Sequence, residues 1–306
     1  MLPVVIVVTR SISDVYHPIT IHQFSDTINF RSIITSVSVW DQFPDLIFNL
    51  SLSENDVPIL KKMENVSTSV AEFADVRFGV KVYQKGKGRP PQTGEEAEGK
   101  IYESSVKESP DYYPYIRGKY VTRWHVATTL AWLKYGQHLA EPRTLNLFTG
   151  QRILVRRIVG ERLVVAPTNE ILIADQLLHT VKPNDTTLDY RYIAALLGSL
   201  PVSYYFQKRF NRTEKTFPEI RIGELAQLPI RTINFSDKAD RARHDRMVSL
   251  VEAMLDAKRK LQTARTDRDR DHYESKCAAL DRQIDALVYE LYELTPEEIA
   301  IVEGRE

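Results

Sequence analysis

Cysteine is almost absent from this 306-residue chain, long hydrophobic runs are missing, and neither sign of charge is in excess. The single cysteine, Cys277, excludes a disulfide framework and is typical of a reducing compartment, so we expect a cytoplasmic protein. It lies on the apolar face of a predicted helix, where a packing role is expected. The apolar run at residues 2–8 is too short to span a membrane and has no signal-peptide cleavage pattern, so it predicts a buried strand.

Motifs of the common nucleic-acid enzymes are also missing. There is no glycine-rich S-adenosylmethionine loop, and no Asn-Pro-Pro-Tyr or Asp-Pro-Pro-Tyr tetrapeptide to grip a flipped base. The glycines at residues 86 and 88 do not form a P-loop, because no Gly-Lys-Ser/Thr follows at the required spacing. No pair of the seven histidines has the i,i+4 spacing typical of zinc ligands on a helix. We therefore expect no catalytic residue, metal site or cofactor on this chain.

The zero net charge hides a segregation along the chain. Residues 1–76 carry 4 Lys/Arg against 9 Asp/Glu, residues 77–232 carry 24 against 15, and residues 233–306 carry 13 against 17. A basic middle between acidic flanks is typical of a DNA-facing module between protein-facing pieces. Chance patterning that serves solubility is the alternative.

Residues 78–124 combine a basic, glycine-rich loop with an aromatic and arginine cluster. The loop contains Lys81, Lys85, Lys87 and Arg89, and the cluster contains Tyr112, Tyr113, Tyr115, Arg117, Lys119, Arg123 and Trp124. Cations contact phosphates, whereas flat side chains and forked donors contact bases. The competing interpretation is a solvated hairpin beside a tyrosine-rich core patch.

Two further segments have the same chemistry. Residues 152–166 predict a hairpin that turns at Gly160 and Glu161. Its projecting cations are Arg152, Arg156, Arg157 and Arg162. In the loop at residues 207–217, two phenylalanines are interleaved with the cations Lys208, Arg209, Arg212 and Lys215. The alternatives are the charged outer face of a half-exposed sheet for the hairpin and a helix C-terminus that favours cations for the loop.

Several short sequence motifs, taken in order, resemble those of a known family. They are Gly79-Val80-Lys81, Lys85-Gly86-Lys87-Gly88, Tyr115-Ile116-Arg117-Gly118-Lys119, Pro167-Thr168-Asn169, and residues 192–199 (YIAALLGS), 217–220 (FPEI), 225–230 (LAQLPI) and 284–303. Over roughly residues 76–303 the chain is similar to the TaqI-like C-terminal specificity domain. That domain is the target-recognition half of type IIG restriction–modification enzymes and related phage-defence DNA methyltransferases. One departure is Gly198, where the family more often has asparagine.

The resemblance implies an α+β fold in three parts. Residues 1–75 resemble the tail of a methyltransferase domain, residues 76–235 would form a mixed-sheet DNA target-recognition domain, and residues 236–306 would form a long C-terminal helical segment. The implied function is recognition of a specific double-stranded DNA sequence. Methyl transfer or cleavage, with S-adenosylmethionine and Mg, would then come from a missing or partner methyltransferase or endonuclease domain.

The family motif also separates the candidate DNA contacts. Arg117 and Lys119 lie in a word that family members share, and shared residues cannot encode varied targets, so we assign them to backbone contact or folding. Base-reading residues are instead expected within residues 122–139, the hairpin at 152–162 and the loop at 207–215.

Two other functions stay open from the sequence. One is a protein-interaction scaffold in which the C-terminal helices form a homodimer and the basic surface is incidental. The other is a nuclease or methyltransferase with a degenerate site; Glu274 and Lys276 have the local form of a nuclease acid–x–lysine pair, but in a charged helical stretch.

Local patterns predict the elements. Residues 4–8, 19–21 and 33–39 predict strands, and residues 56–75 and 186–206 predict helices, the second kinked or broken by Pro201. Beyond Ser236 or Asp237, a heptad-like pattern with a polar middle predicts two long helices or one interrupted helix. Thr295 followed by proline and glutamates predicts a final short helix.

Overall fold

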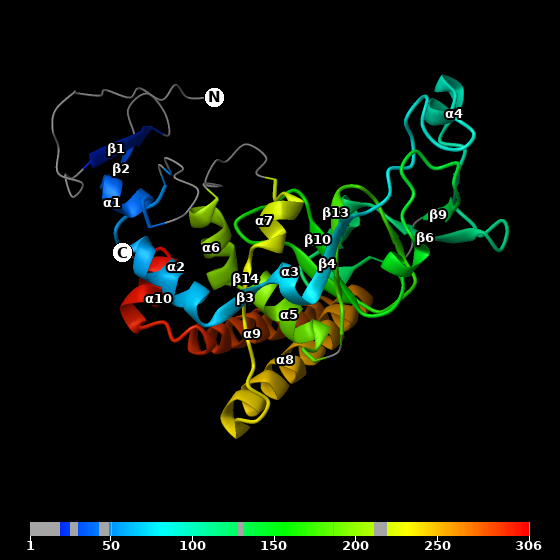
Figure 1. The fold of residues 1–306 in the computed structure, drawn as a ribbon. Coiled ribbons are helices and arrows are strands. Elements are labelled where there is room, and N and C mark those ends of the chain that lie inside the picture. The colour runs from blue at the N-terminus through cyan, green and yellow to red at the C-terminus, as the bar shows by residue number, and fades with distance from the viewer. Residues whose placement is uncertain are drawn as a thin grey trace, which may run out of the picture.

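The computed structural model describes residues 19–24, 30–42, 49, 51–127, 131–185, 187–210 and 219–305. The molecule is elongated: helices from both ends of the chain lie together at one end, and a small sheet projects at the other (Figure 1). Helices and several sheets are mixed along the chain, which confirms the predicted α+β class. Within the described ranges, no helix is long and apolar enough to cross a membrane.

The N-terminal part begins with an antiparallel pair, β1 (Ile19–Phe24) and β2 (Phe30–Thr35). This pair confirms the strand predicted at residues 19–21. The strand predicted at 33–39 is wrong beyond Thr35, because the short helix α1 (Val37–Trp40) follows at once. The strand predicted at residues 4–8 lies outside the described residues.

The helix predicted at 56–75 is only half correct. Helix α2 (Asp56–Asn65) ends just before Val66, Ser67 and Thr68, because these residue types have low helix propensity. Strand β3 (Ser67–Ser69) pairs there with β14 (Pro229–Arg231), which a local pattern cannot reveal. The short helix α3 (Val70–Phe73) and strand β4 (Ala74–Phe78) follow.

The central sheet has four antiparallel strands in the order β11-β10-β13-β4. Strands β10 (Arg152–Arg156) and β11 (Val165–Thr168) form the predicted hairpin, with Gly160 and Glu161 in its loop, and β13 (Leu178–Pro183) joins β10 to β4. Alternate residues of β10 face opposite sides, so Ile153 and Val155 pack into one hydrophobic core while Leu154 packs into a second. The sheet therefore separates two cores.

The second core lies under the projecting sheet, whose strand order is β12-β6-β9-β5. Its strands are β5 (Glu103–Ser104), β6 (Tyr112–Ile116), β9 (Ala131–Lys134) and β12 (Ile173–Ala174). The remaining elements of this region are α4 (Gly94–Gly99), η1 (Gly118–Tyr120), β7 (Val121–Thr122), β8 (His125–Val126) and η2 (Leu145–Phe148). We call residues 80–116 and 131–148 the tip.

The tip leaves the central sheet at Gly79, whose backbone amide donates to Leu178 at 3.0 Å. A Cβ atom at this position would overlap the backbone carbonyl oxygens of Ala174 and Asp175. Only glycine fits such a close approach of two backbones, which explains the first glycine of the Gly-Val-Lys word.

The predicted break at Pro201 is confirmed. Helix α5 (Tyr190–Gly198) ends at Ser199, which accepts a hydrogen bond from Val202 N and so caps α6 (Leu200–Arg209). Pro201 lies in the first turn of α6, where its missing N–H costs nothing. A short helix, α7 (Ile222–Ala226), leads into β14.

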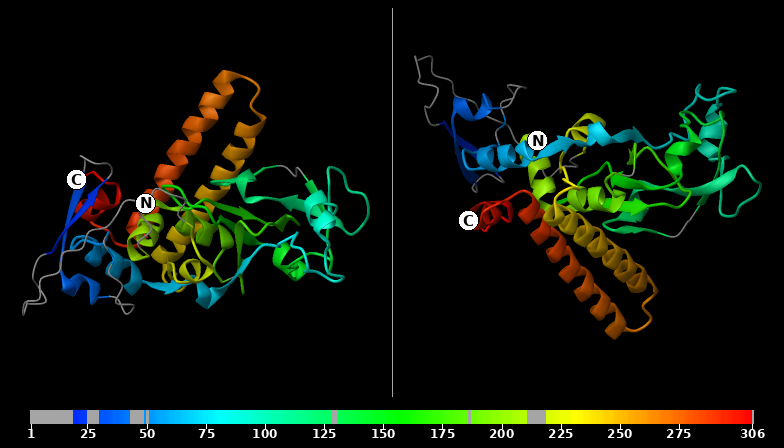
Figure 2. Two further views of the ribbon diagram at one scale, coloured as in Figure 1. Left: turned by 90° about the horizontal axis from the view of Figure 1, so that it is seen from above. Right: turned by 60° about the horizontal axis from the view of Figure 1, so that its bottom comes forward.

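The C-terminal segment forms two long helices, α8 (Lys238–Thr263) and α9 (Asp267–Leu291), and the short α10 (Pro296–Val302). Asp237 caps α8, and Thr295 with Glu298 forms the predicted capping box of α10. The α8–α9 hairpin projects from the body (Figure 2). Cys277 of α9 packs in the first core as predicted, and burial raises the pKa of its thiol.

Hydrophobic packing joins distant parts of the sequence. The first core contains residues of α2, α5, α6, α8 and α9, and Lys62 of α2 donates to Glu298 of α10 at 2.7 Å. The N-terminal and C-terminal segments therefore share one core, whereas the tip packs with the other face of the central sheet in the second core. The division at residues 75 and 235 stays a prediction.

Candidate nucleic-acid interface

Two stretches of the tip run antiparallel and form a narrow ribbon. Lys81 and Glu141 exchange backbone hydrogen bonds of 3.3 and 2.9 Å, and Ala140 N donates to Val82 O at 3.0 Å. Beyond this short ladder the chain turns, on one side through the basic loop and on the other through residues 135–139. We call residues 81–92 and 135–141 the basic ribbon.

The side chain of Gln92 takes the place of further ladder bonds. It is 3% exposed, and its Nε2 donates to Val82 O and His138 O, both at 2.8 Å. Its Oε1 accepts from Gln84 N at 2.9 Å. Gln92 thus satisfies backbone groups of both stretches and holds them together, since a buried amide of this kind is costly unless it is paired.

The loop that Gln92 holds presents its cations to water. Lys85, Lys87 and Arg89 are exposed, and Arg89 N donates to Gln137 O at 2.8 Å. Gly88 has φ +90°, and a Cβ atom there would overlap His138 O, so this position also requires glycine. The predicted basic loop is therefore a defined structure that fixes the backbone of three exposed cations.

A ring stack lies beside this loop. His138 packs on Tyr102 with ring centroids 4.4 Å apart, and Tyr102 stacks on Tyr83 at 5.7 Å. The exposed Gln137 lies in the turn between His138 and the end of β9. Flat rings, an amide and cations therefore meet at the end of the ribbon.

Acidic side chains of the tip are mostly engaged internally. Glu96 accepts from Thr93 N in the capping box of α4, Glu108 accepts from Tyr112 Oη at 2.9 Å, and Glu141 pairs with Arg143 at 3.3 Å. In the described part of the chain, the tip cations with no carboxylate partner are Lys81, Lys85, Lys87, Arg89, Lys100, Lys107 and Lys134. Lys81 donates instead to Gln84 Oε1 at 2.6 Å. The tip as a whole carries 8 Lys/Arg against 7 Asp/Glu, so its positive charge is local to the basic loop.

A second cationic area lies where the tip meets the central sheet. Lys119 is exposed, with its Nζ 4.8 Å from the Tyr120 ring, and Arg156 is half-buried with no carboxylate partner among the described residues. Their segments are neighbours, because Leu177 O accepts from Arg157 N at 2.9 Å while a Cβ atom on Gly118 would lie 3.0 Å from Leu177 Cβ. We call Lys119 and Arg156 the basic edge.

The carboxyl of Asp175 lies beneath this edge. Its Oδ1 accepts from Gly118 N at 3.1 Å and from Leu177 N at 3.0 Å. Burial raises the pKa of Asp175 to about 6, although the two backbone donors oppose the shift. Asp175 thus fixes the backbone of the Gly118-Lys119 motif that family members share.

Arg123 and Trp124 do not face outward. Asp281 of α9 pairs with Arg123 at 2.6 Å and accepts from Trp124 Nε1 at 3.1 Å. Arg162 pairs with Asp281 at 3.4 Å and with Asp285 at 2.6 Å. We call these five residues the junction, because they fasten the recognition segment to the C-terminal helix.

Packing explains the departure at Gly198. Trp124 is 3% exposed, and a Cβ atom on Gly198 would lie 3.3 Å from its ring carbons. Helix α5 approaches the indole so closely that a larger residue would force a shift. We remove Trp124 and Arg123 from the candidate DNA contacts.

Three other predicted arginines are also engaged. Arg117 pairs with Glu103, and Arg157 pairs with Glu219 at 2.7 Å. Arg152 is 0% exposed and donates to the carbonyls of Gly150 and Leu172 at 2.8 and 3.2 Å. Burial lowers the pKa of Arg152 to about 10. The structure does not support DNA contact by the fully buried Arg152.

The second predicted loop is only partly described. Lys208 pairs with Asp56 at 2.9 Å, and Arg209 lies 4.0 Å from Glu64, so both cations at the end of α6 bind α2. These pairs favour the alternative of a helix C-terminus that attracts cations, which here are also neutralised. Arg212 and Lys215 lie outside the described residues, and their contact with DNA stays a prediction.

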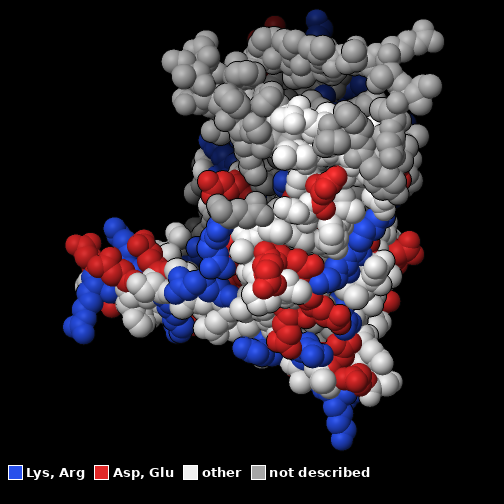
Figure 3. Space-filling model, turned by 90° about the vertical axis from the view of Figure 1, so that its left-hand side faces the viewer, with Lys and Arg blue, Asp and Glu red and all other residues white. Residues whose placement is uncertain are grey.

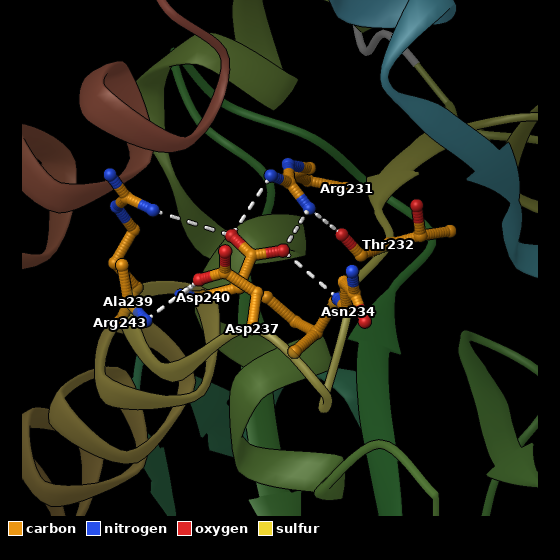
Figure 4. A pocket seen from close by; sticks show the side chains of 8 residues that line it. Arg231, Thr232, Asn234, Asp237, Ala239, Asp240 and Arg243 are labelled. Carbon is orange, nitrogen blue, oxygen red and sulfur yellow. Dashed lines mark hydrogen bonds and ion pairs between the residues drawn. The ribbon is translucent and has the colours of Figure 1, made fainter.

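Two other parts of the described surface differ from this area. At the end that carries α2 and α10, acidic and basic side chains are interspersed below the undescribed residues (Figure 3). A shallow pocket at the start of α8 is occupied by its own ion pairs (Figure 4). There Asp240 accepts from both terminal nitrogens of Arg231, at 2.9 and 3.0 Å. No group of three or more metal-ligating side chains occurs within the described ranges.

Some residues of the interface escaped the sequence analysis. Gln92 carried no signal, because its role depends on three backbone groups that only folding brings together. Asp281 and Asp285 have the i,i+4 spacing of one helix face, but an acidic pair on a charged helix is usually solvated. Gln137 lay within the predicted base-reading range 122–139 without being singled out.

Comparison with known proteins gives a match to one domain model and a similar fold. Residues 113–230 match the model of the TaqI-like C-terminal specificity domain. No curated protein matches the sequence significantly. One similar solved structure is the type IIL restriction–modification enzyme MmeI in complex with DNA, with a TM-score of 0.52 and 11% identity. The match covers 94% of this chain and 41% of that enzyme, so the chain spans about two fifths of its length.

Two further structures are less similar. The type IIG restriction endonuclease BpuSI has a TM-score of 0.42 and 12% identity, over 90% of this chain and 37% of that one. The HsdS subunit from Thermoanaerobacter tengcongensis has a TM-score of 0.35 and 13% identity, over 78% of this chain and 51% of that one.

Proposed function

We propose that this chain, whose residues 113–230 are a TaqI-like C-terminal specificity domain, recognises a specific double-stranded DNA sequence within a restriction–modification system. The carrying observation is the position of the unpaired cations. They lie on the basic ribbon and the basic edge, whereas most other predicted cations in the described part of the chain are paired with carboxylates. Among the described residues, the contacts that remain in the proposal are Lys81, Lys85, Lys87, Arg89, Lys119 and Arg156, and Arg212 and Lys215 remain predicted contacts outside them.

The proposed division of labour leaves chemistry to another part. The similar enzyme MmeI is more than twice as long as the stretch matched here and is solved with DNA, which supports a recognition module that works beside catalytic domains. Methylation or cleavage, with S-adenosylmethionine and Mg, belongs in this proposal to a methyltransferase or endonuclease domain or subunit. A restriction–modification role would place the chain in the cytoplasm.

The test is selection of bound duplexes from a randomised DNA library by the purified chain, followed by sequencing. We expect a motif of a few base pairs and an affinity that falls steeply with salt, because cations displace counterions from phosphates. Binding without any motif, or no binding, would overturn recognition by this chain alone.

A matched pair of variants locates the surface. Lys119→Ala with Arg156→Ala should weaken binding to the selected duplex about tenfold or more, since two phosphate contacts are lost. Arg268→Ala with Arg270→Ala removes the same charge from the exposed start of α9 and should leave the affinity within about twofold. Equal effects of the two pairs would assign binding to net charge rather than to the basic edge.

A further inference from the structure

The basic ribbon pairs two stretches of chain, an arrangement that some DNA-reading proteins use. The tip projects from the body and carries α4, β6 and β9 (Figure 1, Figure 2). Within it, the backbone bonds of Lys81 with Glu141 and of Val82 with Ala140 pair the two stretches of the basic ribbon. Paired strands lie about 4.8 Å apart. A two-stranded ribbon fits the major groove of B-DNA, about 12 Å wide, but not the minor groove, about 6 Å wide.

The ribbon also presents two side chains that can read bases, and their backbones are held side by side. Arg89 and Gln137 are both exposed, on opposite stretches, and the hydrogen bond from Arg89 N to Gln137 O holds their backbones side by side. Arginine donates in a bidentate manner to guanine O6 and N7, and glutamine pairs in the same manner with adenine N6 and N7. Lys85 and Lys87 flank them as point charges suited to phosphates.

From these observations we infer that Arg89 and Gln137 are adjacent base-reading residues, which contact two neighbouring base pairs in the major groove. Lys85 and Lys87 contact the phosphates beside them. Gln92 is a positioning residue, because its amide fixes both stretches while it remains buried and distant from solvent. This inference rests on the proposed function and names the residues that give it specificity.

Two further features favour this assignment. The backbone of the Gln137 turn is fixed on both sides, since Leu139 N donates to Gly136 O at 3.3 Å and His138 O accepts from Gln92. His138 is in turn held on Tyr102 and bonds through Nε2 to Lys134 O at 3.0 Å. A reading side chain on a fixed backbone loses less conformational freedom when it binds.

The experiment repeats the library selection with single variants and compares the recovered motifs. Gln137→Ala should lose information at one position and weaken binding to the selected duplex about tenfold, with Arg89→Ala doing the same at the adjacent position. Gln137→Glu should shift the preference at its position from adenine towards cytosine, because a carboxylate accepts from cytosine N4. Lys87→Ala should weaken all sequences alike and leave the motif unchanged.

Positioning by Gln92 has its own readout. Gln92→Ala should lose information at both positions together, although the residue is buried and touches no base. Gln262→Ala, an exposed glutamine near the end of the α8–α9 hairpin, is the matched control and should reproduce the wild-type motif. Thermal unfolding of each variant separates a lost motif from a lost fold.

The groove is tested with modified DNA. Replacing the adenine read by Gln137 with 7-deazaadenine removes the major-groove N7 acceptor, and should weaken the wild type several-fold but not weaken Gln137→Ala further. Distamycin, a minor-groove ligand, should not compete. If the wild type recovers a motif that Arg89→Ala and Gln137→Ala both preserve, or if distamycin displaces the chain, this inference is overturned while the proposed function stands. If the wild type recovers no motif, both are overturned.

Discussion

The junction and the basic ribbon both combine cations with aromatic residues, but among the described residues the cations are paired with carboxylates in the junction and unpaired in the ribbon. At the junction, Arg123 and Arg162 meet two aspartates of α9, and Trp124 lies buried against Gly198. In the ribbon, Lys85, Lys87 and Arg89 meet no carboxylate in the described part of the chain, and a buried glutamine keeps their loop in shape. The difference teaches that pairing, and not the presence of cations beside aromatic residues, separates a folding contact from a binding surface.

The buried amide and the buried carboxylates also act differently. Gln92 satisfies backbone groups without a charge, so it leaves the positive potential of the ribbon intact. Asp281 and Asp285 neutralise the cations they hold, which suits a fixed contact between helix and sheet. Four predictions test this contrast, in order of decreasing effect on stability.

The largest effect is expected from a comparison of two tryptophans. Trp124→Ala should cost about 3–5 kcal/mol of unfolding free energy, the usual range for a large buried aromatic residue. Trp132 is half-buried on β9 with Lys107 Nζ 5.8 Å from its ring, so Trp132→Ala should cost about 1 kcal/mol. Urea unfolding of both variants measures the difference. Similar losses of unfolding free energy would mean that the two tryptophans contribute equally to the hydrophobic packing.

Asp175 gives a pH-dependent stability at the boundary of the two regions. Burial raises its pKa from the ordinary value of 3.8 to about 6, so the folded state favours the protonated form. Its contribution is therefore complete below about pH 4 and is lost as the pH rises through 6, by about 3 kcal/mol in total at 1.36 kcal/mol per pH unit. Asp175→Asn should remove this decline.

The measurement is urea unfolding of both proteins at pH 4, 5, 6 and 7. Wild type and Asp175→Asn should differ most in slope between pH 4 and 6. An identical slope in the two proteins would show that the Asp175 carboxyl titrates in the folded chain as it does in water.

Removal of one carboxylate should weaken the junction. Asp285→Ala leaves Arg162 without its 2.6 Å partner and Leu200 N without its acceptor, and should cost about 2 kcal/mol because the pair is mostly buried. Asp256→Ala breaks a 2.8 Å pair with Lys260 on the exposed hairpin and should cost less than about 0.5 kcal/mol. Equal costs in chemical unfolding would contradict a structural role for the junction.

The smallest effect on stability is expected in the ribbon, with the largest on binding. Lys85→Gln with Lys87→Gln should change the unfolding free energy by less than about 0.5 kcal/mol. The slope of log affinity against log salt should fall by about 2, since each phosphate contact contributes about 0.9. Fluorescence anisotropy with the selected duplex measures this slope, and an unchanged slope would exclude both lysines from phosphate contact.

Local sequence patterns predicted much of the fold. The hairpin of β10 and β11, the break at Pro201, the cap at Thr295 and the packing of Cys277 each depend on residues close together in the chain. The helix predicted at 56–75 failed beyond Asn65 because β3 pairs with a strand far along the sequence. Local propensity is a weak guide wherever such a partner exists.

The sequence by itself determined the type of surface. It contains a basic, aromatic segment and, in order, the motifs of a specificity domain. Only the tertiary structure decided which cations are free, because each pairing depends on a carboxylate distant in sequence, as for Arg123 with Asp281 or Lys208 with Asp56. The net charge can be counted from the sequence. Whether each charged side chain is paired or free depends on the groups within a few ångströms of it.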